Sequence, residues 1–386
     1  MKAGQVHGDH WTTEPEFEFG ERFGENTDAN FALVSTVRVL TGGNRVVVAE
    51  PRIFRATIWT LDGSLIAEVG RPGEGPGEFM GGFGIRVHSA GFHVRDAQRF
   101  TSFSSDGTLL GTVPFPPRSL GFRGFGLRSE ALLGDGTVLA TPRVPPAAMI
   151  GLGGDDPIQG IPVFRLREVD RDWRMDRIAM LDLRNRQLTI IPEGRSMYEG
   201  GINSAQPFGD YDLTWFDPAV GSVIVVRRNL GGGELELVEI MANGDTAWHQ
   251  HLSPPAVSMS HRQVEGHIDL TARQLVEQVA PDVPYRVMRA AVQEALHVPD
   301  PLPGARRALG THSGEIWFRG IAQDDSLFVW YAVPRGADES RVRKVLVPRS
   351  VRVTDATETH VWGVRTDELG TNYVVGRRLI APHGRR

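Results

Sequence analysis

Hydrophobic and polar residues alternate in short runs along most of the chain, which is the pattern of β-strands with one buried face. The runs are rich in Val, Ile, Phe, Trp and Thr, and Gly, Asp, Asn or Pro residues separate them, as in turns. The clearest strand candidates are RVVVAE (45–50), ATIWTL (56–61), FHVRD (92–96), FTSFSS (100–105), TVLAT (137–141), SVIVVRR (222–228), EIWFRG (315–320), LFVWYAV (327–333) and NYVVGRRL (372–379). The pattern therefore predicts an all-β protein.

Two of the turns align with each other. WTLDGSLIAEVG (59–70) and FSSDGTLLGTVP (103–114) share an aromatic residue, an Asp-Gly pair and a leucine at the same spacing, 44 residues apart. Asp-Gly between alternating strands is a strong hairpin signal, and Asn243-Gly244 repeats it more faintly. A period of about 40 to 45 residues with four strands in each unit is typical of propeller blades.

The glycine-rich stretch GRPGEGPGEFMGG (70–82) lies between these two repeats. It departs from a phosphate-binding loop, because Glu78 occupies the third glycine position and no helix follows. Pro72 and Pro76 also lack the N–H groups that would face an anion. We therefore interpret the stretch as a rigid connector between strands.

GRPGEGPGEF followed by GIRVHSAGFHVRDAQRFTSFSSDGTLLGTV resembles the NHL-type repeat of six-bladed β-propellers, a group found in many bacterial proteins. The second repeat matches the family pattern at Val94, Asp96, Arg99, Phe103, Asp106 and Gly107. The first repeat departs from it, because Glu50 replaces the aspartate. The resemblance covers roughly residues 44 to 114 and implies a six-bladed β-propeller with four-stranded antiparallel blades.

We expect residues 1–386 to form a single domain. The expected blades are 32–70, 83–115, 126–182, 211–252, 305–348 and 349–380, so that 32–252 holds blades one to four and 305–380 holds blades five and six. Blade six has only three good strands, whereas EFEFGERF (16–23) has strand alternation and no partner. We predict that this N-terminal strand completes blade six and closes the ring, which leaves no long exposed sheet edge.

Three long insertions interrupt the strand pattern, at 142–160, 183–210 and 253–304. In a four-stranded blade, the turn between strands two and three and the links between blades lie on one face. The insertions are of these two kinds, and we expect them to surround one mouth of the central channel or to be mere decoration. Within the third, Thr271 to Gln274 has a capping-box pattern, and a second helix is expected from Pro284, so the insertion forms a small helical cap.

Composition limits the functional classes. The formal net charge is −5, which gives no general attraction to nucleic acid or anionic membranes, and no run of about 18 apolar residues predicts a membrane span. The absence of cysteine excludes disulfides, thiol catalysis and cysteine-bound metals. We expect a monomer without nucleic-acid partners, in the periplasm or outside the cell. The first residues lack the apolar core of a signal peptide, and the sequence leaves open whether one preceded them.

Common catalytic motifs are absent, and His249 with His251 lacks a third metal ligand. The leading expectation is that the protein has no cofactor. The alternative is a calcium ion, because lactonase-like six-bladed propellers hold one in the channel through Glu, Asn and Asp. The residues at comparable strand ends are Glu50, Asp96 and Asn229, and their oxygen atoms suit calcium.

Arginine recurs where the second strand of each blade ends. The candidate ligand-binding residues are Arg52, Arg143, Arg227, Arg228, Arg319 and Arg365, and blade two offers Arg95 or Arg99. Guanidinium groups bind carboxylate, sulfate or phosphate in a bidentate manner. Converging arginines would make the channel mouth a site for a small anionic ligand. The competing interpretation is that they are ordinary surface residues, because 40 of the 42 basic residues are arginine.

The leading functional hypothesis is an extracytoplasmic binding or scaffold propeller that recognises a ligand or a protein partner at the loop-rich channel face. The alternative is a hydrolase or lyase of the lactonase-like type, acting at a central metal. The sequence leaves open whether any catalysis occurs, because a propeller fold hosts both classes.

Overall fold

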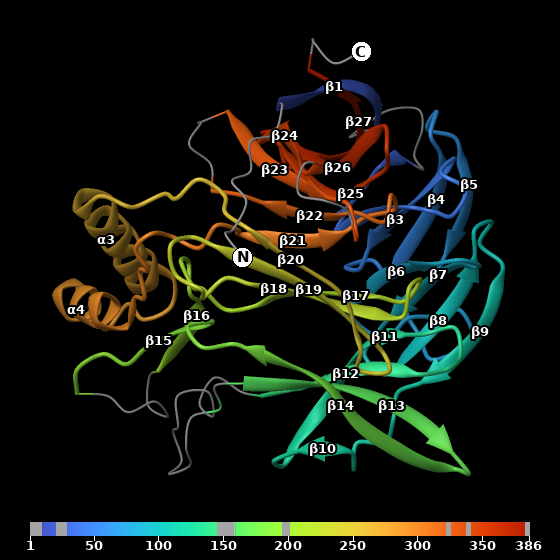
Figure 1. Cartoon of the computed structure of the whole chain (residues 1–386), viewed down its shortest axis with the longest axis horizontal. Coiled ribbons are helices and arrows are strands. Elements are labelled where there is room, and N and C mark those ends of the chain that lie inside the picture. Colours follow the sequence, from blue (N-terminus) through green and yellow to red (C-terminus); the bar gives the residue numbers. More distant parts are fainter. Residues whose placement is uncertain are drawn as a thin grey trace.

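The computed structural model of the chain describes residues 10–20, 29–144, 158, 160–194, 201–321, 326–336 and 341–382. Its antiparallel sheets follow one another around a common axis and form a six-bladed β-propeller (Figure 1). The first long strands of the blades surround this axis, since each contacts its counterpart in a neighbouring blade. The predicted fold class is confirmed.

The strands of the six blades have the following bounds. Blade one contains β2 (Thr36–Val39), β3 (Arg45–Glu50), β4 (Arg55–Thr60) and β5 (Leu65–Val69). Blade two contains β6 (Gly84–His88), β7 (Gly91–Arg95), β8 (Arg99–Ser104) and β9 (Leu109–Pro114). Blade three contains β10 (Gly121–Phe122), β11 (Phe125–Leu132), β12 (Val138–Pro142), β13 (Gly160–Val169) and β14 (Asp172–Asp182). Blade four contains β17 (Leu213–Asp217), β18 (Ser222–Arg227), β19 (Leu235–Met241) and β20 (Thr246–Leu252). Blade five contains β21 (Arg307–Gly310), β22 (Ile316–Arg319), β23 (Leu327–Val333) and β24 (Arg343–Pro348). Blade six contains β25 (Val351–Ala356), β26 (His360–Thr366) and β27 (Asn372–Ile380), joined by β1 (His10–Phe19).

The N-terminal strand closes the ring, as predicted. This strand, β1, pairs antiparallel with β27. The ring of its Phe17 stacks on the ring of Trp362 in blade six, at a centroid distance of 5.6 Å. Phe19 packs on Trp59 of blade one at 5.2 Å, so the strand also joins the last blade to the first. The strand begins earlier than expected, at His10, whereas positions 21–23 of the predicted strand lie outside the described residues. Its first two residues pair parallel with β24, which merges blades five and six into one sheet.

The glycine-rich stretch links β5 to β6, and blade two holds it in place. The guanidinium of Arg99 donates to the carbonyl oxygens of Glu74, Gly75 and Glu78 at 2.7 to 3.0 Å. Asp96 accepts the backbone N–H groups of Met80, Gln98 and Arg99. The aspartate and arginine of the repeat therefore have a structural role, because they satisfy backbone groups that would otherwise lack partners.

The third insertion forms two helices, α3 (His261–Gln278) and α4 (Tyr285–Ala295). The helices do not rest directly on the propeller. They pack on the β15–β16 hairpin of the second insertion (β15, Gln187–Ile190; β16, Ile202–Ala205), and Leu188 and Ile190 belong to the same buried cluster as the apolar faces of both helices. This insertion layer, as we call the helices and the hairpin together, has its own small core.

The predicted start of the first helix is wrong. The capping box is formed by Ser260 and Gln263, and Ser260 lies eleven residues before the expected Thr271, which is inside the helix. Ser260 is the better cap because its side chain and that of Gln263 satisfy each other's backbone N–H groups. The second helix begins after Pro284, as predicted. Within the part of the chain that the structure describes, neither helix is long and apolar enough to cross a membrane.

Candidate functional site

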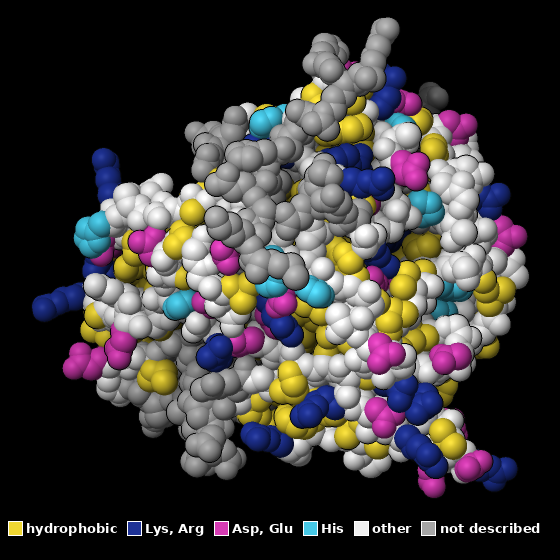
Figure 2. Space-filling view, viewed as in Figure 1, with side chains coloured by type: hydrophobic (Ala, Val, Ile, Leu, Met, Phe, Trp, Pro, Cys, Tyr) yellow, Lys and Arg dark blue, Asp and Glu magenta, His cyan; other side chains and the backbone are white. Residues whose placement is uncertain are grey.

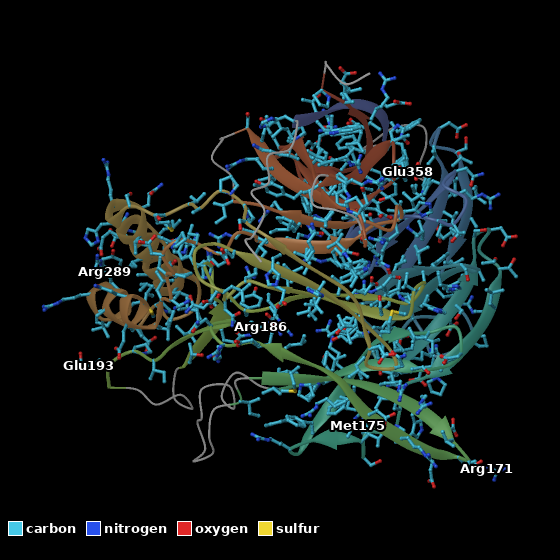
Figure 3. The ribbon with its side chains drawn as sticks, viewed as in Figure 1. Arg171, Met175, Arg186, Glu193, Arg289 and Glu358 are labelled. Carbon is cyan, nitrogen blue, oxygen red and sulfur yellow. The ribbon has the colours of Figure 1, made fainter. Side chains whose placement is uncertain are left out.

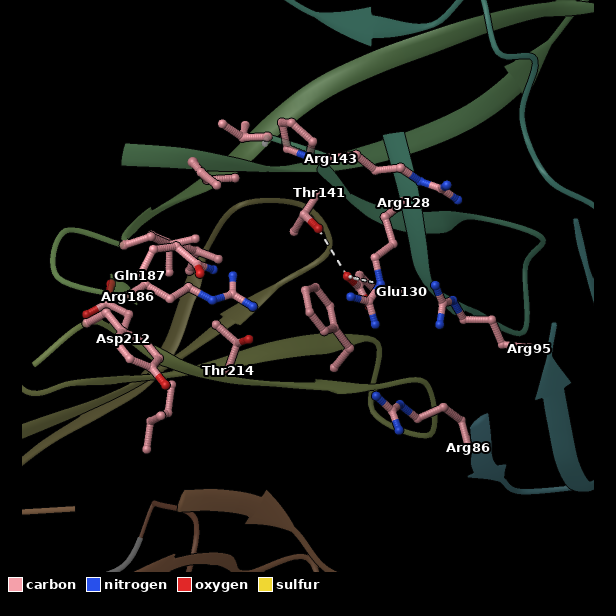
Figure 4. Close-up of a pocket in the computed structure, with 18 residues that line it drawn as sticks. Arg86, Arg95, Arg128, Glu130, Thr141, Arg143, Arg186, Gln187, Asp212 and Thr214 are labelled. Carbon is pink, nitrogen blue, oxygen red and sulfur yellow. Dashed lines mark hydrogen bonds and ion pairs between the residues drawn. The ribbon is translucent and has the colours of Figure 1, made fainter. Parts of the chain in front are cut away.

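A cavity of about 760 Å³ opens at the channel between blades two, three and four (Figure 4). We call it the arginine cavity, because five of its lining residues are arginines. Its lining consists of Arg86, Arg95, Arg128, Glu130, Thr141, Pro142, Arg143, Val144, Ile161, Leu181, Leu183, Arg186, Gln187, Tyr211, Asp212, Leu213, Thr214 and Phe216. The first two insertions contribute Arg143, Val144, Leu183, Arg186 and Gln187, which agrees with the expectation that insertions surround a channel mouth.

Strands near the propeller axis supply several of the charges. Arg128 and Glu130 are two residues apart on β11, where a β-bulge interrupts the pairing between Ser129 and Ala131, and both line the cavity. Arg86 comes from β6 and Arg95 ends β7. The inner strands β6 and β11 therefore place charged residues on the wall of this cavity.

Among the described lining residues, Glu130 is the one carboxylate that balances the arginines at this end of the cavity. Glu130 contacts Nε of Arg128 at 3.2 Å and accepts a hydrogen bond of 3.0 Å from the Thr141 hydroxyl. Burial lowers the pKa of Arg95, and the charges of Arg128 and Arg143 lower it further, while Glu130 opposes them. Burial also lowers the pKa of Arg86 to about 10. Besides burial, repulsion among neighbouring guanidinium groups therefore contributes to the lowered pKa values of Arg86 and Arg95.

Asp212 lies at the other end of the cavity, just before β17. Its Oδ2 atom accepts the backbone N–H of Asp182 at 2.8 Å, whereas Oδ1 is buried and has no partner among the described residues. Burial raises the pKa of Asp212 to about 6. A buried carboxyl that exchanges its proton near neutral pH is a recurrent feature of functional sites. Arg186 and Tyr211 line the same end.

A smaller cavity of about 470 Å³ adjoins the first and shares Leu181 and Asp212 with it. Here Asn229 donates to Oδ2 of Asp182 at 2.6 Å. Burial disfavours the charged form of Asp182, but hydrogen bonds from Arg184 outweigh it and leave the pKa lowered. Arg227 lines this cavity and pairs with Glu236 at 2.8 Å.

Of the six arginines expected to bind a ligand, one, Arg143, lines the arginine cavity, and Arg95, which blade two offered as an alternative to Arg99, lines it as well. Arg227 lines the adjoining one, and Arg228 is buried and donates to the carbonyl oxygens of Tyr211 and Ala305. The other three lie apart from both cavities: Arg319 stacks over Phe328, Arg365 pairs with Glu18 of β1, and Arg52 is exposed in the turn after β3.

The three expected calcium ligands make separate contacts. Glu50 is fully buried and binds Arg55 at 2.8 Å and the N–H of Ala32. Asp96 holds the connector of blade two, and Asn229 binds Asp182, as described above. No group of three or more His, Asp or Glu side chains suited to a metal occurs among the residues that the structure describes.

Sequence reasoning missed Arg86, Arg128 and Arg186. The expected arginines were taken from strand ends, whereas Arg86 and Arg128 lie within inner strands. A signal was present in LRSEALL (127–133), where Arg128 and Glu130 stand two residues apart within an otherwise mostly apolar run. A charged pair at alternate positions of an inner strand indicates a face that lines the channel.

No protein-family model matches the chain, and no curated protein has detectable similarity to it. Solved structures do match along most of their length. A member of the DUF4221 family from Bacteroides vulgatus is 8% identical, with 98% of this chain and 100% of that chain covered and a TM-score of 0.45. A putative exported protein from Bacteroides fragilis is 9% identical, with 96% and 99% covered and a TM-score of 0.42. Virginiamycin B lyase from Staphylococcus aureus, in an inactive form with quinupristin, is 11% identical, with 95% of both chains covered and a TM-score of 0.37.

Proposed function

We propose that the protein is a binding propeller that takes a small anionic molecule in the arginine cavity. One observation carries the proposal: five guanidinium groups and two carboxyl groups line a single concave space. Among the described residues, no carboxylate pairs with the guanidinium of Arg86, Arg95, Arg143 or Arg186. An anion in the cavity would supply the missing charge, and guanidinium forks suit carboxylate, sulfate or phosphate groups.

The excess of positive charge belongs to the cavity and is not a property of the whole surface. The chain carries a net charge of −5, and on the face shown in Figure 2 basic and acidic side chains are interspersed. A cationic cavity in an acidic protein concentrates the field where a ligand enters. The concave shape favours a small molecule over a flat protein surface as the partner.

The test uses Arg143, because its side chain is exposed and its backbone N–H makes the one hydrogen bond that links it to the other described residues. We expect sulfate, phosphate, citrate or acidic sugars to raise the melting temperature at low salt, and titration calorimetry to give a dissociation constant. Arg143→Gln should weaken binding roughly tenfold or more, since a hydrogen bond to a charged group is worth about 1.5–3 kcal/mol. Arg118→Gln, at an exposed site outside the cavity, is the matched control.

The absence of any stabilising anion would refute the proposal, and so would equal affinities of Arg143→Gln and wild type. Added salt should weaken binding, because it screens charges at an open site.

The alternative, an enzyme of the hydrolase or lyase type, is favoured by Asp212, whose raised pKa suits acid–base catalysis. Turnover of a bound anion that disappears in Asp212→Asn would favour the enzyme, whereas binding without turnover favours the binding protein. The kinship with NHL-type propellers and the extracytoplasmic location are also proposals. The first is supported by the contacts of Asp96 and Arg99 with the connector, and cell fractionation tests the second.

A further inference from the structure

The arginine cavity has two chemically different ends. Figure 4 shows Arg86, Arg95, Arg128 and Arg143 grouped at one end, and Arg186 with Gln187 and Asp212 at the other. The pKa shifts agree with this grouping. The charges of Arg128 and Arg143 lower the pKa of Arg95, and those of Arg95 and Arg128 lower the pKa of Arg86. We call the first group the basic end and the second the Arg186 end.

Apolar side chains also line the cavity, among them Ile161 of β13, Leu181 of β14 and Phe216 of β17. Thr214 lies beside Arg186 in Figure 4. Apolar side chains cannot form hydrogen bonds with a charged group. They favour contact with methylene or ring carbons, because this contact removes those carbons from water. The cavity therefore has two sockets for acidic groups, the basic end and Arg186, the second of which also holds Asp212, and apolar side chains among its lining that suit carbon.

Arg186 forms the second socket on its own. It lies in the turn between β14 and the β15–β16 hairpin, where the chain leaves blade three (Figure 3). Its side chain is exposed and contacts the ring of Tyr211 at 6.0 Å, and no carboxylate pairs with it among the described residues. Gln187 adds an amide beside it that can donate to an acidic group.

We propose that the ligand is an elongated molecule with two acidic groups joined by an apolar spacer, one group at the basic end and one at Arg186. This inference rests on the proposed function and adds the class of ligand. Because the two sockets lie at a fixed separation, they favour one spacer length. A dianion with a short spacer reaches only one socket, and a dianion with a long spacer must bend to reach both.

The test is a calorimetric series of linear α,ω-dicarboxylates with increasing numbers of methylene groups, each compared with the monocarboxylate of the same length. We expect a single optimal length, at which the dicarboxylate binds roughly ten- to a hundredfold more tightly than its monocarboxylate. Arg186→Gln should abolish this preference, because the second acidic group loses its cationic partner. Arg186→Lys should retain part of the preference, since it keeps the charge. Arg143→Gln should weaken both classes.

Three results overturn the inference. Equal binding of monocarboxylates and dicarboxylates removes the second socket and leaves the proposed function intact. A preference that survives in Arg186→Gln places the second acidic group elsewhere. The absence of binding by any member, together with no stabilisation by inorganic anions, overturns the proposed function as well.

Discussion

Replacing Asp212 with asparagine should stabilise the unliganded protein at neutral pH. Asp212 is 4% exposed, and its pKa is about 6 against an ordinary value of 3.8. The folded state therefore binds this proton more tightly than the unfolded chain does. Each tenfold change in the acid constant is worth about 1.4 kcal/mol, so ionised Asp212 costs the folded state roughly 3 kcal/mol above pH 6.

The sign of this effect depends on pH. Below about pH 4 the carboxyl is protonated in both states and costs nothing; stability then falls as pH rises from the unfolded pKa to the folded one. Asparagine is neutral throughout and can still accept the N–H of Asp182. The gain from Asp212→Asn should approach roughly 3 kcal/mol at pH 7.5 and shrink towards zero near pH 4.

Urea denaturation followed by tryptophan fluorescence, at pH 4.5 and pH 7.5, measures this difference. Asp62→Asn provides a control of opposite sign. Asp62 accepts hydrogen bonds from Thr60 and Ser64 in an exposed turn, which lower its pKa, so its replacement should destabilise the protein more at neutral than at acidic pH. A loss of stability in Asp212→Asn at pH 7.5, or a gain equally large at pH 4.5, would refute the reasoning about burial.

Further predictions concern the closing strand, the connector and the helices, which support the propeller around the cavity. Deleting residues 1–20 should lower the melting temperature markedly or yield insoluble protein, because the deletion removes the strand that pairs with β27 and the contact of Phe17 with Trp362. Unchanged thermal stability would contradict ring closure. Arg99→Ala should lower the free energy of unfolding by roughly 2 kcal/mol or more in urea denaturation, because three carbonyl groups of the connector lose a charged donor. Replacing 253–304 with a Gly-Ser linker should preserve the β-type circular dichroism spectrum but increase binding of a hydrophobic dye, because Leu188 loses its cover; loss of the β spectrum would make the helices part of the propeller core.

The fold was largely predictable because its signals are local. Alternation along each strand and the turns at Asp62-Gly63 and Asp106-Gly107 depend on neighbouring residues only. The closing strand could be inferred from its alternation and from the strand that blade six lacked. The start of α3 was missed because Thr271 to Gln274 repeats the capping pattern inside a helix that Ser260 begins.

The site was less predictable because its residues come from distant parts of the chain. Arg86, Arg128 and Arg186 belong to different segments, and only the curvature of the ring brings them to one cavity. Arg365 shows the converse. It ends a second long strand of a blade as expected, but its partner Glu18 lies 347 residues away on the closing strand. Which arginine is free and which is paired depends on contacts that no local pattern contains.

The most direct test of the central claim is an anomalous difference map from crystals soaked in millimolar sodium selenate at low ionic strength. Selenate has the shape and charge of sulfate, and selenium scatters anomalously, so the map locates bound anions without prior assumptions. We predict the strongest peak inside the arginine cavity, within hydrogen-bonding distance of Arg128 or Arg143, and its loss in crystals of Arg143→Gln. Peaks confined to exposed arginines outside the cavity, with none inside it, would contradict the claim that this cavity binds anions.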